Sequence, residues 1–222
     1  YTATALGALM LATAPMAADA SMIRIEDLGG VDADFVLADT GVLTAASATR
    51  IDIGGMVVTV EVTPFEDPGK SFLNTTSVTT SGAGNIRITT SENDFGQGAG
   101  SPHPSSLAFT ISATKLSSNG ITAEAHVDDG NVLEAKTDQI GATLSLAGPL
   151  APPAFPLFDL TTDSAVLDDP FSMTSVFYVK HDSAGDVTSF DATVVAAVPL
   201  PAAGIMLLTA LGGLGGAAGL RR

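Results

Sequence analysis

The sequence contains no cysteine, no tryptophan and only two tyrosines among its 222 residues. The absence of cysteine excludes a disulfide framework, a thiolate metal site and a cysteine nucleophile. Basic residues are also scarce, with 9 Lys and Arg against 24 Asp and Glu and a formal net charge of -15. Because phosphate recognition requires clustered Lys and Arg, this balance predicts no binding of nucleic acid.

Charged residues are nearly absent from both ends of the chain, although hydrophobic residues make up 45% of the whole. Residues 1–20 and 198–222 contain only Asp19, Arg221 and Arg222, so residues 21–197 hold 23 acidic and 7 basic residues, a net charge of -16. We therefore expect three parts: an apolar segment at 1–20, an acidic domain at 21–197 and an apolar tail at 198–222. The central part is long enough for one hydrophobic core.

The first segment has the features of a secretory signal peptide. An uncharged apolar run over residues 5–14 is followed by Pro15, and Ala18 and Ala20 form the A-x-A pattern that signal peptidase recognises. A positively charged start is missing and the first residue is Tyr1, so we expect the signal to be truncated at its beginning. Cleavage after Ala20 predicts a mature chain that begins at Ser21. A buried helix of a cytosolic protein is the alternative.

The tail predicts a transmembrane helix. Residues 203–220 are uncharged and apolar, and Arg221 and Arg222 end the sequence. A span of about 17–25 such residues crosses a bilayer, and flanking arginines stay on the cytoplasmic side. Both ends thus predict that the acidic domain is exported across the inner membrane.

A short motif precedes the predicted helix and consists of Val198, Pro199, Leu200, Pro201 and Ala202. Two prolines disfavour a regular strand or helix here and leave an extended backbone that a protease can bind. Motif, apolar helix and terminal arginines together resemble the VPLPA-CTERM form of the PEP-CTERM sorting signal. That resemblance covers the tail only. It implies an exosortase-like membrane protease as partner, a Gram-negative bacterium as source, and sorting to the cell surface or extracellular matrix, often alongside exopolysaccharide.

The acidic part predicts an all-β fold, a single β-sandwich domain. Short segments rich in Thr, Val, Ile and Phe are separated by Gly, Asp, Asn, Ser and Pro clusters at roughly ten-residue spacing. Asn119-Gly120 predicts a hairpin turn, and residues 181–186 predict the turn of a closing hairpin. Residues 91–106 are expected to form a loop. The proline-rich stretch 148–159 predicts an extended connector that could separate two subdomains. Strands are predicted at 56–62, 85–90, 107–112, 121–127, 142–146, 175–180 and 187–195.

The sequence contains no catalytic motif. It lacks the G-x-S-x-G nucleophile elbow, and the spacing of its three histidines, His103, His126 and His181, does not predict a zinc site. We expect these histidines to be solvated or to lie at strand edges. Carboxylates are too numerous for any pair to predict a glycosidase. No cofactor is predicted, although calcium could bind acid pairs in loops, which otherwise cap turns. These pairs are Asp32/Asp34, Asp128/Asp129, Asp168/Asp169 and Asp182/Asp186.

The sequence therefore predicts a non-enzymatic, exported and surface-sorted protein of the bacterial envelope. Two alternatives carry the same tail: an exported hydrolase acting on polysaccharide, and a calcium-dependent carbohydrate-binding adhesin. A groove with two convergent carboxylates of shifted pKa would favour the hydrolase.

Overall fold

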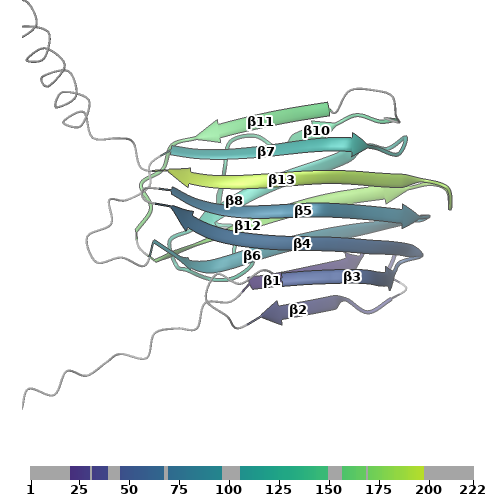
Figure 1. Ribbon diagram of the computed structural model, residues 1–222, viewed down its shortest axis with the longest axis horizontal. Helices are drawn as coiled ribbons and strands as arrows, with labels where there is room; N and C mark the ends of the chain where they lie inside the picture. The colour runs from purple at the N-terminus through teal and green to yellow at the C-terminus, as the bar shows by residue number, and fades with distance from the viewer. Residues whose placement is uncertain are drawn as a thin grey trace, which may run out of the picture.

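The described part of the protein is a sandwich of two antiparallel sheets (Figure 1). The computed structural model describes residues 21–30, 32–39, 46–67, 70–96, 106–149, 157–168 and 170–197. Within these ranges the regular elements are strands, which confirms the predicted all-β fold. None of the described residues belongs to a helix long and apolar enough to cross a membrane. Residues 1–20 and the tail 198–222, with the predicted signal peptide and transmembrane helix, lie outside the described ranges.

One sheet has seven strands in the order β10-β8-β12-β6-β1-β2, with β9 paired to β8. The other has six strands in the order β11-β7-β13-β5-β4-β3. The bounds are β1 Ser21–Asp27, β2 Phe35–Asp39, β3 Ala46–Ile53, β4 Met56–Asp67, β5 Lys70–Gly82, β6 Gly84–Phe95, β7 Ser106–Lys115, β8 Ile121–Asp128, β9 Asp138–Gln139, β10 Leu144–Leu146, β11 Leu157–Asp163, β12 Phe171–His181 and β13 Val187–Ala197.

Each predicted strand lies in or overlaps an observed strand, but six observed strands were not predicted. β5 is the most instructive, because its sequence KSFLNTTSVTTSG is rich in Ser and Thr and resembles a loop. Its burial nevertheless alternates, with Leu73, Thr75, Val78 and Thr80 facing the interior. The predicted loop at 91–106 also begins too early, since β6 continues to Phe95.

Both predicted hairpins are wrong. Asn119-Gly120 connects β7 of the six-stranded sheet to β8 of the seven-stranded sheet, and the turn at 182–186 likewise connects β12 to β13 across the sandwich. The turn geometry itself is local, with Gly120 N donating to Ser117 O at 3.0 Å. β7 pairs instead with β11 and β13, and β8 pairs with β10 and β12. The apolar sides of β7 and β8 therefore face each other across the core from opposite sheets.

Aromatic rings from the two sheets contact one another in the hydrophobic core. The ring of Phe177 in β12 lies 4.9 Å from that of Phe190 in β13 and 6.5 Å from that of Phe109 in β7, centroid to centroid. All three side chains are buried. Such pairs add about 0.5–1.5 kcal/mol each to the free energy of burying the rings.

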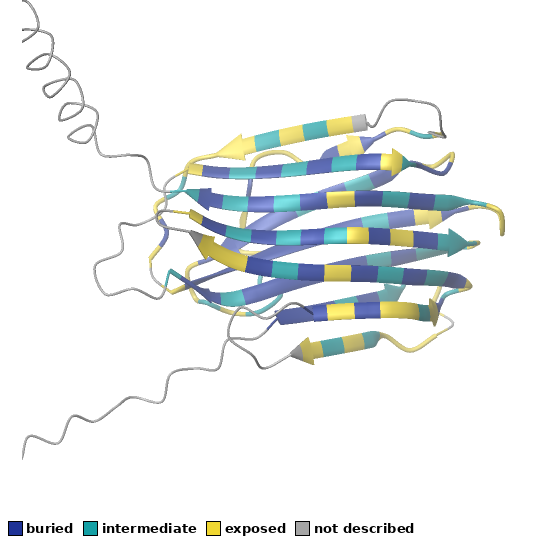
Figure 2. Cartoon of the chain, viewed as in Figure 1, coloured by how far each residue is buried: buried dark blue, intermediate teal, exposed yellow. Residues whose placement is uncertain are grey.

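The outer faces of the two sheets differ (Figure 2). Strands of the six-stranded sheet alternate between buried residues and residues that are half-buried or exposed. In β13 every second residue from Thr188 to Ala196 is buried. β12 is buried along almost its whole length, and the second half of β8 is buried on both sides. A chain segment therefore covers part of the outer face of the seven-stranded sheet. That segment is residues 129–137, between β8 and β9.

We predict that Gly82→Ala destabilises the protein by about 2–4 kcal/mol. Gly82 has a φ of 102°, and a Cβ there would lie 2.4 Å from the Gly55 carbonyl oxygen. Both the backbone angle and the close contact oppose a side chain. Urea unfolding of the two proteins measures the difference.

Gly185→Ala is the matched control, because no atom lies within 4 Å of a Cβ at that position. Its free energy of unfolding should stay within about 0.5 kcal/mol of the unsubstituted value. Equal effects of the two substitutions would contradict the assigned packing of Gly82.

Candidate functional site

The predicted sorting and cleavage residues lie outside the described ranges. β13 is the last strand in the sequence and ends at Ala197. The motif Val198–Ala202 therefore follows β13 directly in the sequence. Ala18, Ala20, Arg221 and Arg222 also lie outside the described residues. Their predicted roles stay predictions.

Acidic residues at turns act as hydrogen-bond acceptors for the backbone. Asp32 Oδ2 accepts from Gly54 N at 2.7 Å, and Asp128 Oδ2 accepts from Val132 N at 3.0 Å. Asp186 Oδ2 accepts from Asp182 N and Ser183 N at 3.0 and 3.1 Å. In the described part of the chain, no three acidic or histidine side chains are close enough together to hold a metal ion. The geometry thus supports turn capping at these acids.

The histidines were expected to be solvated or to lie at strand edges, and the first alternative is wrong for His126 and His181, which are 5% and 3% exposed. His181 is the last residue of β12, and His103 lies outside the described residues. His181 Nδ1 lies 2.9 Å from Gly82 O, and its Nε2 lies 2.9 Å from Thr188 Oγ1. Because a carbonyl oxygen only accepts, Nδ1 carries the proton of the neutral ring. Burial lowers the pKa of His181, so it is a neutral structural residue that joins the two sheets.

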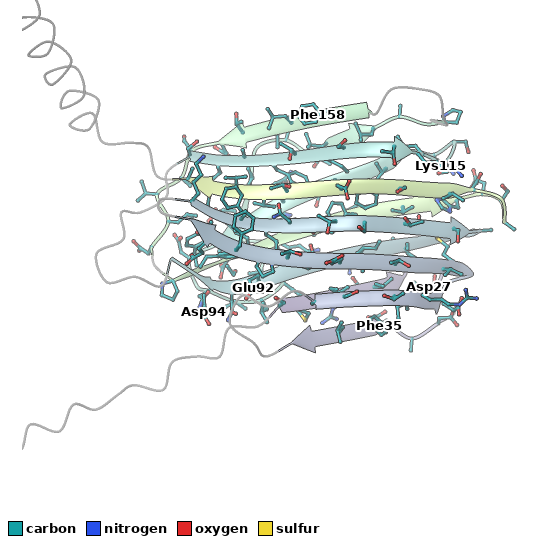
Figure 3. The ribbon with its side chains drawn as sticks, viewed as in Figure 1. Asp27, Phe35, Glu92, Asp94, Lys115 and Phe158 are labelled. Carbon is teal, nitrogen blue, oxygen red and sulfur yellow. The ribbon has the colours of Figure 1, made fainter. Side chains whose placement is uncertain are left out.

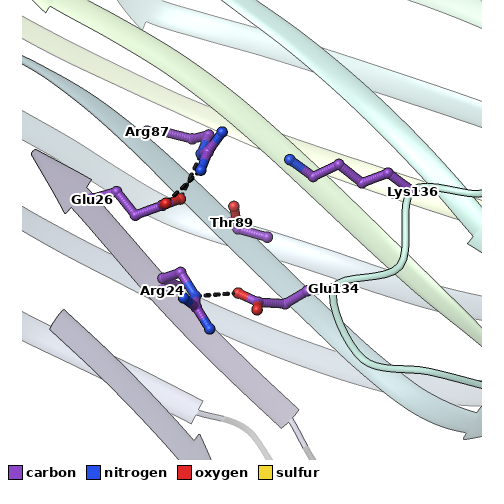
Figure 4. Close-up of a pocket in the computed structure, with 6 residues that line it drawn as sticks. All are labelled: Arg24, Glu26, Arg87, Thr89, Glu134 and Lys136. Carbon is purple, nitrogen blue, oxygen red and sulfur yellow. Dashed lines mark hydrogen bonds and ion pairs between the residues drawn. The ribbon is translucent and has the colours of Figure 1, made fainter. Parts of the chain in front are cut away.

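The candidate site is a shallow hollow of about 110 Å³ on the outer face of the seven-stranded sheet (Figure 4). Its floor is formed by alternate residues of β1 and β6, and its wall by the covering segment 129–137. Strand register sets the floor, since Glu26 pairs with Arg87 and Arg24 pairs with Thr89. The lining residues are Arg24, Glu26, Arg87, Thr89, Glu134 and Lys136.

Hydrogen bonds from the sheet hold the covering segment in place. Glu134 N donates to Ser91 Oγ of β6 at 3.0 Å, and Ser172 Oγ of β12 donates to Val132 O at 2.8 Å. Asn131 Oδ1 accepts from Asp94 N at 2.7 Å, and its amide nitrogen donates back to the Asp94 carboxylate. These contacts fix the backbone that carries Glu134 and Lys136.

Two ion pairs organise the charges in the hollow. Arg24 Nε donates to Glu134 Oε1 at 2.6 Å, which ties β1 to the covering segment. Arg87 donates to both carboxylate oxygens of Glu26 through Nε and Nη2. The hydrogen bonds from Arg87 lower the pKa of Glu26, and they raise the pKa of Arg87 against the opposing effect of burial. Both groups are charged at neutral pH.

Lys136 is the remaining cation of the hollow. It is exposed and makes no ion pair with any described residue. Figure 4 shows its side chain reaching from the covering segment over the floor toward Arg87. The lining thus holds three cations and two anions, a local charge of +1 on a chain of charge -15.

Sequence reasoning did not predict this hollow. Arg24, Glu26 and Arg87 stand in alternating strand patterns, and their spacing carries no motif. Glu134 and Lys136 reach the site only because the segment after β8 folds back over the sheet. The one available sequence signal is the concentration of bases, since three of the seven basic residues in 21–197 line the hollow.

No protein-family model matches the chain, and no curated protein matches it. Among solved structures, the chain is similar to the carbohydrate-binding module TmCBM61 in complex with β-1,4-galactotriose. Identity is 7% and the TM-score 0.34, over 70% of this chain and 88% of that one. It is also similar to the K1 cleaved adhesin domain of Lys-gingipain from Porphyromonas gingivalis W83, at 11% identity and a TM-score of 0.33, over 70% and 99%. At these values no residue of either protein can be matched to one of this chain.

We predict that Glu26→Gln lowers thermal stability at neutral pH but has little effect in acid. The folded-state pKa of Glu26 lies below its ordinary value of 4.5, so the ion pair stabilises the fold above about pH 4.5. That contribution is lost as the pH falls through the lowered folded-state pKa. Melting of both proteins between pH 7 and pH 3 measures it as a shrinking difference in midpoint.

Glu61→Gln provides the control. Glu61 is exposed on β4 and makes no ion pair with a described residue. Its difference from the unsubstituted protein should be small at every pH. A Glu26→Gln difference that stays constant from pH 7 to pH 3 would contradict the assigned pair.

Proposed function

We propose that this chain is an exported, non-enzymatic binding protein of the bacterial cell surface or extracellular matrix. Its ligand is an acidic saccharide, a sugar carrying a carboxylate, bound in the hollow over β1 and β6. Its tail is sorted by an exosortase-like protease through Val198–Ala202. The observation that carries the ligand assignment is the local charge of +1 on an otherwise strongly acidic protein.

The chemistry of the hollow supports a saccharide. A sugar presents hydroxyls that both donate and accept hydrogen bonds, and the lining offers donors on Arg24 and Arg87, acceptors on Glu26 and Glu134, and the Thr89 hydroxyl. Tyr178 of β12 pairs with Arg87 and adds an aromatic side chain to the same face. Few of the lining groups are apolar, which disfavours a hydrophobic ligand.

Lys136 supports a carboxylate on that saccharide. The two arginines are each held by a glutamate, whereas the Lys136 ammonium has no such partner among the described residues. The Nη groups of Arg24 are not used in its bond to Glu134, and they provide further donors. The many distant acids do not oppose this contact strongly, because screening at physiological salt reduces charge interactions beyond about 8 Å.

The same geometry disfavours the hydrolase alternative. A glycosidase needs one carboxylic acid with a raised pKa to protonate the leaving group. Glu26 has a lowered pKa because Arg87 binds both of its oxygens. Glu134 is held by Arg24. A binding role uses these carboxylates as fixed hydrogen-bond acceptors.

We predict that the protein binds an oligosaccharide containing uronic acid more tightly than its carboxyl-reduced neutral counterpart. Lys136→Gln should weaken binding of the acidic form by about tenfold, since one charge-assisted contact contributes about 1.5 kcal/mol. Melting should not change, because Lys136 is exposed. Calorimetric titration with both sugars, with and without calcium, measures these effects.

Lys115→Gln on β7 is the matched control, since Lys115 lies outside the hollow (Figure 3) and should not affect binding. Phe65→Ala tests a second surface, where Phe65 and Phe72 stack at 4.3 Å on the six-stranded sheet. Loss of binding on Phe65→Ala but not on Lys136→Gln would move the site to that surface. Equal affinity for both sugars would contradict the acidic ligand, and binding that requires calcium would favour the calcium-dependent adhesin.

We predict that replacing Pro199 and Pro201 with Ala, or deleting Arg221 and Arg222, leaves full-length protein in the membrane of a host that has an exosortase. The first change removes the extended backbone expected to enter the protease, and the second removes the stop signal. Mass spectrometry of the mature termini measures processing. Pro170→Ala, at an exposed proline before β12, should mature normally. Normal maturation of both tail variants would overturn the sorting proposal.

A further inference from the structure

Glu92 is a carboxylate in the interior of the sandwich. It is 0% exposed and lies near one end of the molecule, opposite the end that carries Asp27 (Figure 3). Its side chain points inward from β6, on the same side as Ile86 and Ile88. Burial of a charged carboxylate is costly unless an opposite charge or strong hydrogen bonds compensate it.

Ser21 lies directly opposite Glu92 on β1. The two residues pair in the antiparallel register, and the Ser21 hydroxyl donates to Glu92 Oε2. Ser21 is also 0% exposed and is the first residue of its strand. The same residue is the predicted first residue of the mature chain, because the A-x-A pattern places cleavage after Ala20.

Cleavage would change the chemistry of this pair. Before cleavage the Ser21 nitrogen is a neutral amide with one proton. Hydrolysis breaks its bond to the Ala20 carbonyl carbon and adds water, so Ala20 leaves as a carboxylate and the nitrogen becomes an amine. An α-amine with an ordinary pKa of about 7.7–8.0 is mostly protonated at neutral pH. The nitrogen is attached to the Cα whose side chain already contacts Glu92.

We infer that Glu92 binds the new N-terminus inside the sandwich. Once the signal peptide is removed, the α-ammonium of Ser21 forms an ion pair with the Glu92 carboxylate. The mature chain is then more stable than the precursor, and this stability is gained only after export. The inference rests on the proposed export with cleavage after Ala20, and it is independent of the saccharide site, which lies on the outer face of the same sheet.

The test is a double-mutant cycle between the N-terminus and Glu92. Two chains, both ending at Arg222, are compared: one begins at Ser21 and the other at Ala18 with Asp19→Asn. The second moves the ammonium by about 10 Å without adding a carboxylate. Glu92→Gln is made in each, and thermal unfolding is measured under the same conditions.

In the chain that begins at Ser21, Glu92→Gln should lower the melting midpoint by about 5–15 °C. In the extended chain the loss should be smaller by about 5 °C or more. Since the coupling is a difference of differences, any general destabilisation by the substitution cancels. An equal loss in both chains would overturn the inference. So would an exported protein whose N-terminus, read by mass spectrometry, is not Ser21.

Discussion

The structure depends on the need to cover both faces of the seven-stranded sheet. Its inner face packs on the six-stranded sheet through Phe109, Phe177 and Phe190. Part of its outer face is covered by residues 129–137, which are bound through Ser91, Asn131 and Ser172. Ser91 and Ser172 bond to backbone groups of the segment, and the Asn131 side chain bonds to the backbone of β6, so together they fix the path of the segment. The hollow exists because this segment lies over β6 and stops short of covering Arg87 and Glu26.

The charged residues are distributed differently at the turns and in the hollow. Most of the acidic residues in the described part of the chain cap turns or face solvent, where a charged group needs no partner inside the protein. In the hollow, by contrast, half-buried carboxylates and guanidinium groups hold one another in defined positions, and Lys136 makes no ion pair with a described residue. A strongly acidic protein thus has one hollow whose lining carries a local charge of +1.

Much of the fold could be predicted from local patterns, but the pairing of strands could not. Alternation in β4, β7, β8 and β13 is visible in the sequence because one side of each strand is apolar. β5 was missed because threonines occupy interior positions, where Thr75 bonds to Thr90 at 2.8 Å. Turns are present at Asn119-Gly120, as predicted, and at 182–186, one residue later than the predicted start at His181. Each crosses between sheets, because a turn dipeptide determines a local bend and not the sheet that the next strand joins.

Composition and periodicity are local properties, so they were enough to divide the chain into an acidic β domain and two apolar ends. The predicted export and sorting signals are linear motifs and could be read in the same way. The meeting of Arg24, Glu26, Arg87, Glu134 and Lys136 in one hollow, and of Ser21 with the buried Glu92, became visible only in the folded chain. The residues of the hollow are separated by up to 112 positions in the sequence. They meet through strand register and a segment folded over the sheet, both of which are set by burial of the whole core.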